Sequence, residues 1–314
     1  MLMPAARGSP TLAGCTAPHK LQVAPRRFPS PPLLLEPQTL VCVWRARAVA
    51  APCPSLAGAP KAAWTRPPSE VTFHIEPYSN RDDQNMNKNV KYIIDKYGNH
   101  PAFYRYKTST GQSLPMFYVY DSYITKPKMW ANLLTPSGSQ SVRGTPYDGL
   151  FIALLVEEKH KYDILQSGFD GIYTYFATNG FTYGSSHQNW AKLKSFCDEN
   201  NLMFIPSVGP GYIDTNIRPW NSQNTRNRIN GKYYEVSLST ALQTHPSLIS
   251  ITSFNEWHEG TQIENAVPKR TTNTVYLDYR PHKPSYYLEL TRKWSEKYSK
   301  ERIAYTLDQQ LPAS

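Results

Sequence analysis

Cysteine is scarce in this sequence, and long apolar runs are missing from it. Four cysteines occur in 314 residues, and three of them (Cys15, Cys42 and Cys53) fall within the first 70 residues. This arrangement does not make a disulfide framework and does not indicate a redox compartment. No stretch reaches the about 18 consecutive apolar residues of a membrane span. The first 20 residues also lack the apolar segment of a secretory signal.

Acidic residues are outnumbered by basic ones, 24 against 34, which gives a formal charge of +10 and a pI near 9.3. The excess is concentrated in residues 1–70, where 8 basic residues face 2 acidic ones and contribute +6 (8 − 2). Residues 71–314 therefore carry +4 (10 − 6), which is ordinary for a domain of that size. The charge does not indicate a nucleic-acid partner.

Residues 1–70 also differ from the rest in composition. They hold 13 of the 27 prolines and no Tyr, Ile, Asp or Asn, whereas residues 71–314 hold all 22 tyrosines. A segment rich in Pro, Ala and Arg without periodicity is typical of disorder. We therefore expect a disordered leader over 1–70 and a folded domain over 71–314.

From residue 71 onward, short apolar β-rich runs alternate with amphipathic helical patterns, which indicates βα units around a parallel sheet. The expected strands are Val71–Ile75, Met116–Tyr120, Leu150–Leu155, Gly171–Phe176, Leu202–Val208 and Leu248–Phe254. The expected helices are Asn85–Tyr97, Lys128–Leu134, Glu157–Ser167, Ser186–Asn200, Tyr233–Thr244 and Pro284–Tyr298. The strands are apolar nearly throughout, as expected for strands buried on both faces.

Polar and aromatic residues gather just beyond these strands, as in the run Asn255–Glu259. A (β/α)8 barrel of the TIM type builds its active site at this end, and a doubly wound open sheet would do the same. The segment Gly209-Pro210-Gly211 lacks the spacing of a dinucleotide-binding loop. We expect an α/β fold of the (β/α)8 type that is incomplete, because six βα units are visible where a closed barrel needs eight.

The run SITSFNEWHEGT, residues 250–261, carries the most informative pair of side chains. Glu256 and Glu259 lie three residues apart on a loop that leaves a buried strand. Glycoside hydrolysis needs two carboxyl groups at one anomeric centre. Trp257 and His258 are expected to wall the pocket and raise the pKa of one carboxyl by desolvation. The alternative is that both glutamates are solvated loop charges.

A metal site is a further alternative for the same run. His258 to Gln262 begins like the zinc motif HExxH, but the second ligand position holds Gln262, so the motif fails. One His with a carboxylate remains as a weaker metal-binding pattern. We predict no metal and no cofactor.

Five stretches carry a resemblance to a known family. They are VTFHIEPY (71–78), YVYDSY (118–123), GIYTYF (171–176), PSVGPGYID (206–214) and FNEWHEG (254–260). Together they resemble glycoside hydrolase family 99, and the resemblance runs from about Val71 to Ser314. It implies a (β/α)8 barrel and retaining, metal-free cleavage of an internal α-1,2-mannose linkage. The implied substrate is a glucosylated high-mannose N-glycan on glycoproteins in the Golgi, with no further protein partner.

The resemblance also implies a mechanism in which the 2-hydroxyl of the sugar is the nucleophile and a 1,2-anhydro sugar is the intermediate. By motif position Glu256 would be the base for this hydroxyl. Glu259 would protonate the leaving oxygen and then activate water. Tyr175 and Arg218 are implied contacts to the reacting sugar or its neighbours. Other candidates for substrate binding, some of which could equally shape their loops, are Tyr212, Asp214, Trp220, Asn255, Trp257 and His258.

Family members carry a membrane anchor, a stem and the first barrel units before the segment that corresponds to Val71. None of these is recognisable in residues 1–70, which look unrelated to the family. Loss of two strands would leave unpaired strand edges and uncovered apolar surface. The competing hypothesis is therefore a non-catalytic product, either an unstable truncated isoform or a lectin-like remnant that binds glycans without cleaving them.

Overall fold

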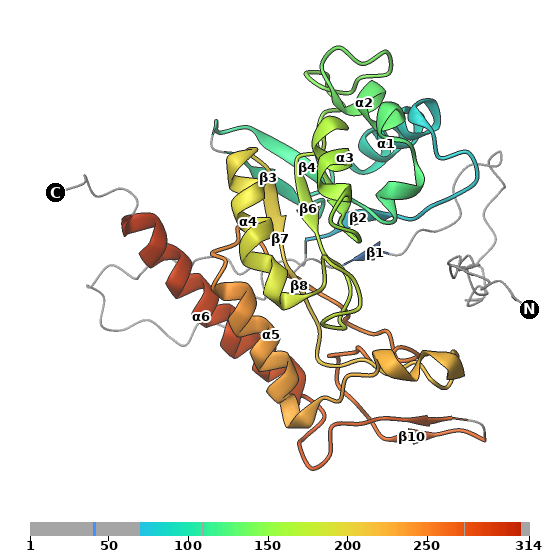
Figure 1. Cartoon of the computed structure of the whole chain (residues 1–314), viewed down its shortest axis with the longest axis vertical. Helices are drawn as coiled ribbons and strands as arrows, with labels where there is room; N and C mark the ends of the chain where they lie inside the picture. Colours follow the sequence, from blue (N-terminus) through green and yellow to red (C-terminus); the bar gives the residue numbers. More distant parts are fainter. Residues whose placement is uncertain (1–39, 42–69, 109, 273, 309–314) are drawn as a thin grey trace, which may run out of the picture. The chain divides into compact units, whose positions relative to one another are not determined.

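The computed structural model describes residues 40–41, 70–108, 110–272 and 274–308 (Figure 1). The leader expected over 1–70 therefore lies outside the described residues, apart from residue 70 and the two-residue strand β1 (Leu40–Val41). The sequence did not predict β1. It pairs antiparallel with the first strand of the domain, with Leu40 opposite Phe73.

A parallel sheet forms the centre of the domain, and its strands lie where the apolar runs predicted them. Neighbouring strands follow the chain in the order β2, β4, β5, β6, β7, and β8 pairs in parallel with β9. The strands are β2 (Thr72–Ile75), β4 (Ser113–Val119), β5 (Leu150–Leu154), β6 (Gly171–Tyr173), β7 (Met203–Ile205), β8 (Ser207–Val208) and β9 (Ser250–Ile251). Pro206 separates β7 from β8, because proline has no N–H to donate to the ladder.

Each predicted helix is present after its strand, with ends displaced by a few residues, except that the last helix ends at Asp308, ten residues beyond the expected Tyr298. The helices are α1 (Asp83–Tyr97), α2 (Pro127–Leu134), α3 (His160–Gln166), α4 (Trp190–Glu199), α5 (Lys232–Leu242) and α6 (Tyr286–Asp308). The side chain of Asp82 caps α1 by accepting a hydrogen bond from the Asn85 N–H at 2.8 Å. Helix α6 begins two residues after the expected Pro284. It lies beside α5 (Figure 1), where the rings of Tyr234 and Tyr287 are 6.1 Å apart.

Both faces of the sheet are apolar. Successive side chains of a strand point to opposite faces, so a strand that is apolar throughout supplies apolar residues to both. On the outer face, Phe117, Phe151 and Ile172 join buried helical residues such as Trp130 and Trp190 in one core. The inner face forms a second core, made of Met116, Tyr118, Leu150, Ile152, Leu154, Tyr173 and Ile205. Two buried faces with helices on the outside are the arrangement of a TIM-type barrel.

The barrel is not closed within the described part of the chain. Strand β2 pairs with β4 and β1, and β9 pairs with β8, so no pairing among the described residues joins β9 back to β2. The expected incomplete (β/α)8 barrel is therefore confirmed.

Short elements decorate this frame. They are β3 (Arg105–Lys107), which pairs with β4, the hairpin of β10 (Lys269–Arg270) and β11 (Val275–Tyr276), and the 3-10 turns η1 (Ser122–Ile124), η2 (His187–Asn189), η3 (Pro219–Asn224) and η4 (Ile229–Gly231). The turn η3 and the hairpin flank the loop after β9 in the chain, and both contribute to the site described next.

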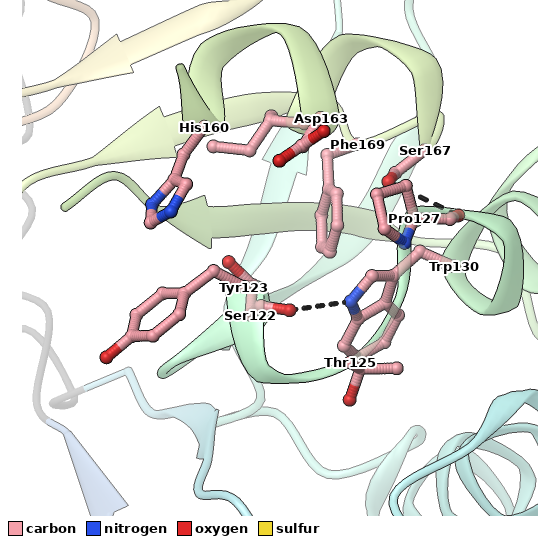
Figure 2. A pocket seen from close by; sticks show the side chains of 10 residues that line it. Ser122, Tyr123, Thr125, Pro127, Trp130, His160, Asp163, Ser167 and Phe169 are labelled. Atoms are coloured by element: carbon pink, nitrogen blue, oxygen red, sulfur yellow. Dashed lines mark hydrogen bonds between the residues drawn. The ribbon is translucent and has the colours of Figure 1, made fainter. Parts of the chain in front are cut away.

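A cavity of about 20 Å³ lies between η1, α2 and α3, away from the loop after β9 (Figure 2). The rings of Tyr123 and His160 stack 4.9 Å apart on one side of it. Trp130 lines the other side and donates a hydrogen bond from Nε1 to the Ser122 carbonyl at 2.9 Å. Its volume suits about one water molecule, which is far too little for a sugar.

Candidate active site

The loop after β9 carries Glu256 and Glu259 and closes on itself. The Ser253 N–H donates to the Thr261 carbonyl at 3.0 Å, and the hydroxyls of the same two residues lie 2.7 Å apart. The Ser253 hydroxyl also accepts the Glu256 N–H at 2.9 Å. These bonds hold the backbone of both glutamates near the end of the strand. The name catalytic loop is used below for residues 253–262.

A second segment, residues 212–218, is bonded to the catalytic loop through its backbone. The Ile213 N–H donates to the Glu259 carbonyl at 2.9 Å. Gly260 follows with φ of +60°, and a Cβ there would lie 2.6 Å from Ile213 Cγ2. Glycine is therefore required on two grounds, the left-handed backbone and the close approach of Ile213.

Arg228 fastens the far end of the catalytic loop. Its Nη2 donates to the carbonyls of Gly260 and Gln262, both at 2.8 Å. The guanidinium lies 5.1 Å from the ring centroid of Tyr279 and 4.5 Å from that of Tyr287. The Tyr279 hydroxyl donates to the Gln262 carbonyl at 2.9 Å. The Arg228 cation thus binds the catalytic loop while its position is fixed by two aromatic rings.

Glu259 is paired and largely enclosed. Its Oε1 accepts a hydrogen bond from Arg218 Nη1 at 3.1 Å, and its side chain is 25% exposed. Burial raises the pKa of Glu259 above its ordinary value, and the negative charge of Glu256 acts in the same direction. Arg218 lowers this pKa but does not reverse the shift. The Glu259 carboxyl therefore keeps its proton to a higher pH than an ordinary glutamate does.

Glu256 has different surroundings from Glu259. Its side chain is exposed, and Oε1 accepts only a backbone hydrogen bond, from the His258 N–H at 3.1 Å, among the contacts of the described residues. The two carboxyls are electrostatically coupled, since the charge of Glu256 affects the pKa of Glu259. Two neighbouring carboxyls in unequal environments can divide the roles of acid and base.

Tyr175 lies just beyond the C-terminal end of β6, where the backbone bends. Its φ is +53°, and its N–H donates to the Ser207 hydroxyl at 2.6 Å. The ring stacks on His74 at 5.6 Å and meets Tyr120 edge-on at 4.7 Å. Burial raises the pKa of the Tyr175 hydroxyl, and the charge of Glu259 raises it further. Tyr175 therefore faces the glutamate pair as a neutral donor.

His74 is held as a buried, satisfied side chain. Nδ1 lies 2.9 Å from Glu76 Oε1, and Nε2 lies 2.8 Å from the Tyr173 hydroxyl. The ring is 3% exposed. Protein groups therefore engage both ring nitrogens of His74.

Arg218 and Asp214 form an ion pair within one segment. Arg218 Nη1 lies 3.0 Å from Asp214 Oδ2 as well as 3.1 Å from Glu259. Asp214 Oδ2 also accepts hydrogen bonds from the Tyr212 hydroxyl and from Asn221 Nδ2, both at 2.9 Å. Asp214 is 0% exposed, so its carboxylate faces protein groups rather than solvent.

Trp257 and His258 contact the hairpin that follows the catalytic loop. Trp257 Nε1 donates to Glu264 Oε1 at 2.6 Å, and its ring meets Tyr276 of β11 at 6.3 Å. His258 is exposed, and its ring lies 6.0 Å from that of Tyr276. Both rings thus contact β11 of the hairpin, and their part in desolvating a catalytic carboxyl stays a prediction.

The remaining predicted residues lie at the surface. Trp220, in η3, is 75% exposed, and Asn255 is exposed on the catalytic loop. Both are accessible to a large ligand, and neither is drawn into the bonds around Glu259 by the contacts described above.

Several site residues were not found from the sequence. Asn221, Arg228, Glu264 and Tyr279 all support the two glutamates or their loop. Asn and Arg in irregular segments carry no periodic signal, so sequence reasoning had no ground to select them. Among the described residues, no group of three or more His, Cys, Asp or Glu side chains is arranged to hold a metal ion.

Comparison with known proteins agrees with the fold. The sequence profile of glycosyl hydrolase family 99 matches residues 61–300. The chain therefore belongs to glycoside hydrolase family 99. The match begins at residue 61, inside the segment that its composition assigned to the leader.

Named relatives are close in sequence. The chain is 89% identical over 245 residues to the glycoprotein endo-alpha-1,2-mannosidase of Rattus norvegicus, which covers 78% of this chain and 53% of the relative. It is 68% identical over 233 residues to a glycoprotein endo-alpha-1,2-mannosidase-like protein of Homo sapiens, covering 74% and 51%. The chain thus spans about half the length of the curated relatives it matches.

A solved structure supports the same fold. The family 99 endo-alpha-mannosidase from Bacteroides thetaiotaomicron matches with a TM-score of 0.71 and 51% sequence identity, over 74% of this chain and 67% of that one. Among the helices of the described residues, none combines the length and apolarity needed to cross a membrane.

Proposed function

We propose that the chain is a retaining, endo-acting α-1,2-mannosidase of glucosylated high-mannose N-glycans. The observation that carries this proposal is the unequal setting of the two glutamates. Glu259 is enclosed beside Arg218 with a raised pKa, whereas Glu256 is exposed on the same loop. A proton donor and a proton acceptor at one place are what the cleavage of a glycosidic bond requires.

In the first step, Glu256 accepts the proton of the 2-hydroxyl of the mannose whose linkage is cut. Its O2 then bonds to C1, and the bond from C1 to the leaving oxygen breaks as Glu259 donates its proton to that oxygen. In the second step, water attacks C1 of the 1,2-anhydro sugar and Glu259 takes its proton. The C1–O2 bond breaks, and Glu256 returns its proton to O2. Two displacements at C1 give net retention.

The surrounding residues take different parts in this proposal. Tyr175 and Arg218 lie next to the glutamate pair and are assigned to contact with the reacting sugar. The exposed residues Trp220, Asn255 and His258 are available to the rest of the glycan. Tyr212, Asp214 and Trp257 are assigned to support of the loops, because each is bonded to a neighbouring protein group. A location in the Golgi belongs to the same proposal, and immunolocalisation tests it.

The test uses two variants and two substrates. On a glucosylated high-mannose glycan, release of a disaccharide or larger product should fall by about 10²-fold or more in Glu259→Gln and in Glu256→Gln. On a substrate with a good leaving group, which needs little acid assistance, Glu259→Gln should recover activity and Glu256→Gln should not. Equal losses in both variants on the activated substrate would overturn the division of roles.

A glycan-binding protein without turnover is the second candidate. The sheet that remains open among the described residues favours it, because a site assembled from loops of all the strands depends on closure. Glycan binding by calorimetry, together with no product from either substrate, would select this candidate.

A further inference from the structure

The segment 212–218 contains a buried carboxylate that is bonded to protein groups, that of Asp214. Asp214 is 0% exposed, and a single oxygen, Oδ2, accepts hydrogen bonds from Tyr212, Asn221 and Arg218 at 2.9 to 3.0 Å. Its backbone carbonyl accepts the N–H groups of Ile217 and Arg218 at 2.9 and 2.7 Å. Asp214 thus determines both the turn that leads to Arg218 and the position of the Arg218 guanidinium.

The guanidinium links this carboxylate to the catalytic loop. The same nitrogen, Arg218 Nη1, lies 3.0 Å from Asp214 Oδ2 and 3.1 Å from Glu259 Oε1. One N–H of that group can point to each carboxylate. The backbone bond from Ile213 to Glu259 holds the two segments at this separation.

We propose that Asp214 is a positioning residue that holds Arg218 against Glu259 and shares the charge of its guanidinium between two carboxylates. The inference rests on the proposed role of Glu259 as the acid. An arginine paired with Glu259 alone would lock that group as a carboxylate, which cannot protonate a leaving oxygen. A second carboxylate on the same nitrogen weakens the lock while it keeps the acid in place.

The electrostatics around Glu259 agree with this arrangement. The charge of Asp214 raises the pKa of Glu259, whereas Arg218 lowers it. The charged and titratable groups that face Glu259 come from its own loop, from residues 212–218 and from the inner ends of β4 and β6. They are Glu256, Tyr212, Asp214, Arg218, Tyr120 and Tyr175. The tyrosines stay neutral in the working range because their pKa values are raised.

The test is a double-mutant cycle on the full chain with Asp214→Asn, Arg218→Gln and the double variant. Asp214→Asn preserves shape and removes the charge, so the alkaline limb of the kcat/KM profile on the glycan should move to lower pH. Its kcat on the glycan should fall about 10- to 100-fold near neutral pH, and the activated substrate should recover most of the loss. In the Arg218→Gln background, the further loss caused by Asp214→Asn should shrink to less than about threefold.

A matched control separates positioning from stability. Asp170→Asn removes a carboxylate that also pairs with an arginine, since Asp170 Oδ2 lies 2.8 Å from Arg143 Nη2. This pair lies before β6, at the opposite end of the strand from Tyr175, so Asp170→Asn should lower the melting temperature without moving the pH profile. Loss factors for Asp214→Asn and Arg218→Gln that simply multiply in the double variant, or an unmoved profile in Asp214→Asn, would overturn the proposal.

A measurement without turnover keeps the inference distinct from the proposed function. The carboxyl of Glu259 can be titrated by ¹³C NMR in Glu-labelled protein, with Glu259→Gln to assign the signal. The midpoint should be lower in Asp214→Asn and higher in Arg218→Gln. If the wild-type chain cleaves neither substrate, the proposed function fails. If the titration midpoint of Glu259 is unchanged in both variants, the positioning role of Asp214 is overturned, whatever the activity. Should Asp214→Asn not melt cooperatively, Arg218→Gln, whose side chain is already 32% exposed, decides by the same criterion.

Discussion

Replacement of Arg228 by methionine should loosen the catalytic loop. Arg228 donates to the carbonyls of Gly260 and Gln262 at 2.8 Å and lies over the rings of Tyr279 and Tyr287. Methionine keeps much of the apolar stem that packs against these rings. It removes both hydrogen bonds and the cation, so Arg228→Met isolates the polar contribution.

The size of the effect follows from these contacts. A hydrogen bond from a charged donor contributes about 1.5–3 kcal/mol, and the contact of a cation with an aromatic ring about 0.5–2 kcal/mol. Water that reaches the freed carbonyls offsets part of the loss. We expect the free energy of unfolding to fall by about 3 kcal/mol. For a domain of this size the melting temperature should then fall by about 6–12 °C.

Activity should fall as well, because Gly260 and Gln262 adjoin the proposed acid. A displacement of about 1 Å at a catalytic group costs on the order of 10²-fold in rate. We would measure thermal unfolding by circular dichroism, and kcat on the activated and the glycan substrate well below both melting temperatures. Arg228→Lys keeps the charge but cannot reproduce the paired geometry, so it should recover only part of the stability.

Arg143→Met is the matched control for this experiment. Arg143 also binds carbonyls, those of Leu134, Gly149 and Gly168, but these lie away from the catalytic loop. It should lose stability and keep the kcat of the folded protein. An Arg228→Met variant with wild-type melting temperature and wild-type kcat would refute the argument that this cation organises the loop.

Three further predictions concern stability. Because the pKa of Glu259 is raised above 4.5, ionising Glu259 destabilises the folded state as pH rises through the folded pKa. The urea midpoint of Glu259→Gln relative to that of the wild type should therefore increase as the pH is raised from acid to alkaline. A difference that does not change with pH would contradict this. Gly260→Ala should lower the free energy of unfolding by about 1–3 kcal/mol, measured by urea titration, because of its positive φ and the contact with Ile213. Trp130→Phe should cost about 2 kcal/mol in the same assay through the lost bond to Ser122 and a larger cavity; an unchanged midpoint would show that the pocket wall adapts.

The strands were predictable because each is an almost uninterrupted run of apolar residues. In Leu150–Leu154, for example, every residue is buried, so an apolar run has no other stable setting than a strand covered on both faces. The apolar pattern alone could not reveal that Pro206 splits the predicted strand Leu202–Val208 into β7 and β8. Nor could it reveal that β1 pairs with the edge of β2, since that partner comes from a segment without strand periodicity.

The site was predictable only where it is local in sequence. Glu256 and Glu259 are three residues apart, and a strand end points both into one region. The contacts of Trp257 were not predictable, because they depend on Glu264 and on Tyr276 of the hairpin, which no spacing rule connects to it. Arg228 and Asn221 were missed for related reasons: the partners of Arg228 lie 32 or more residues away, and Asn221 belongs to the irregular turn η3.

The sequence by itself determined the family, the order of strands and helices, and the loop on which two carboxyls stand. These properties depend on side-chain type and on short spacing along the chain. The tertiary structure alone decided that the two carboxyls are unequal. Burial and the charge of Arg218 act through space, and Arg218 is brought to Glu259 from 41 residues away by the turn at Asp214. The difference between two glutamates of one loop is therefore a property of the folded chain.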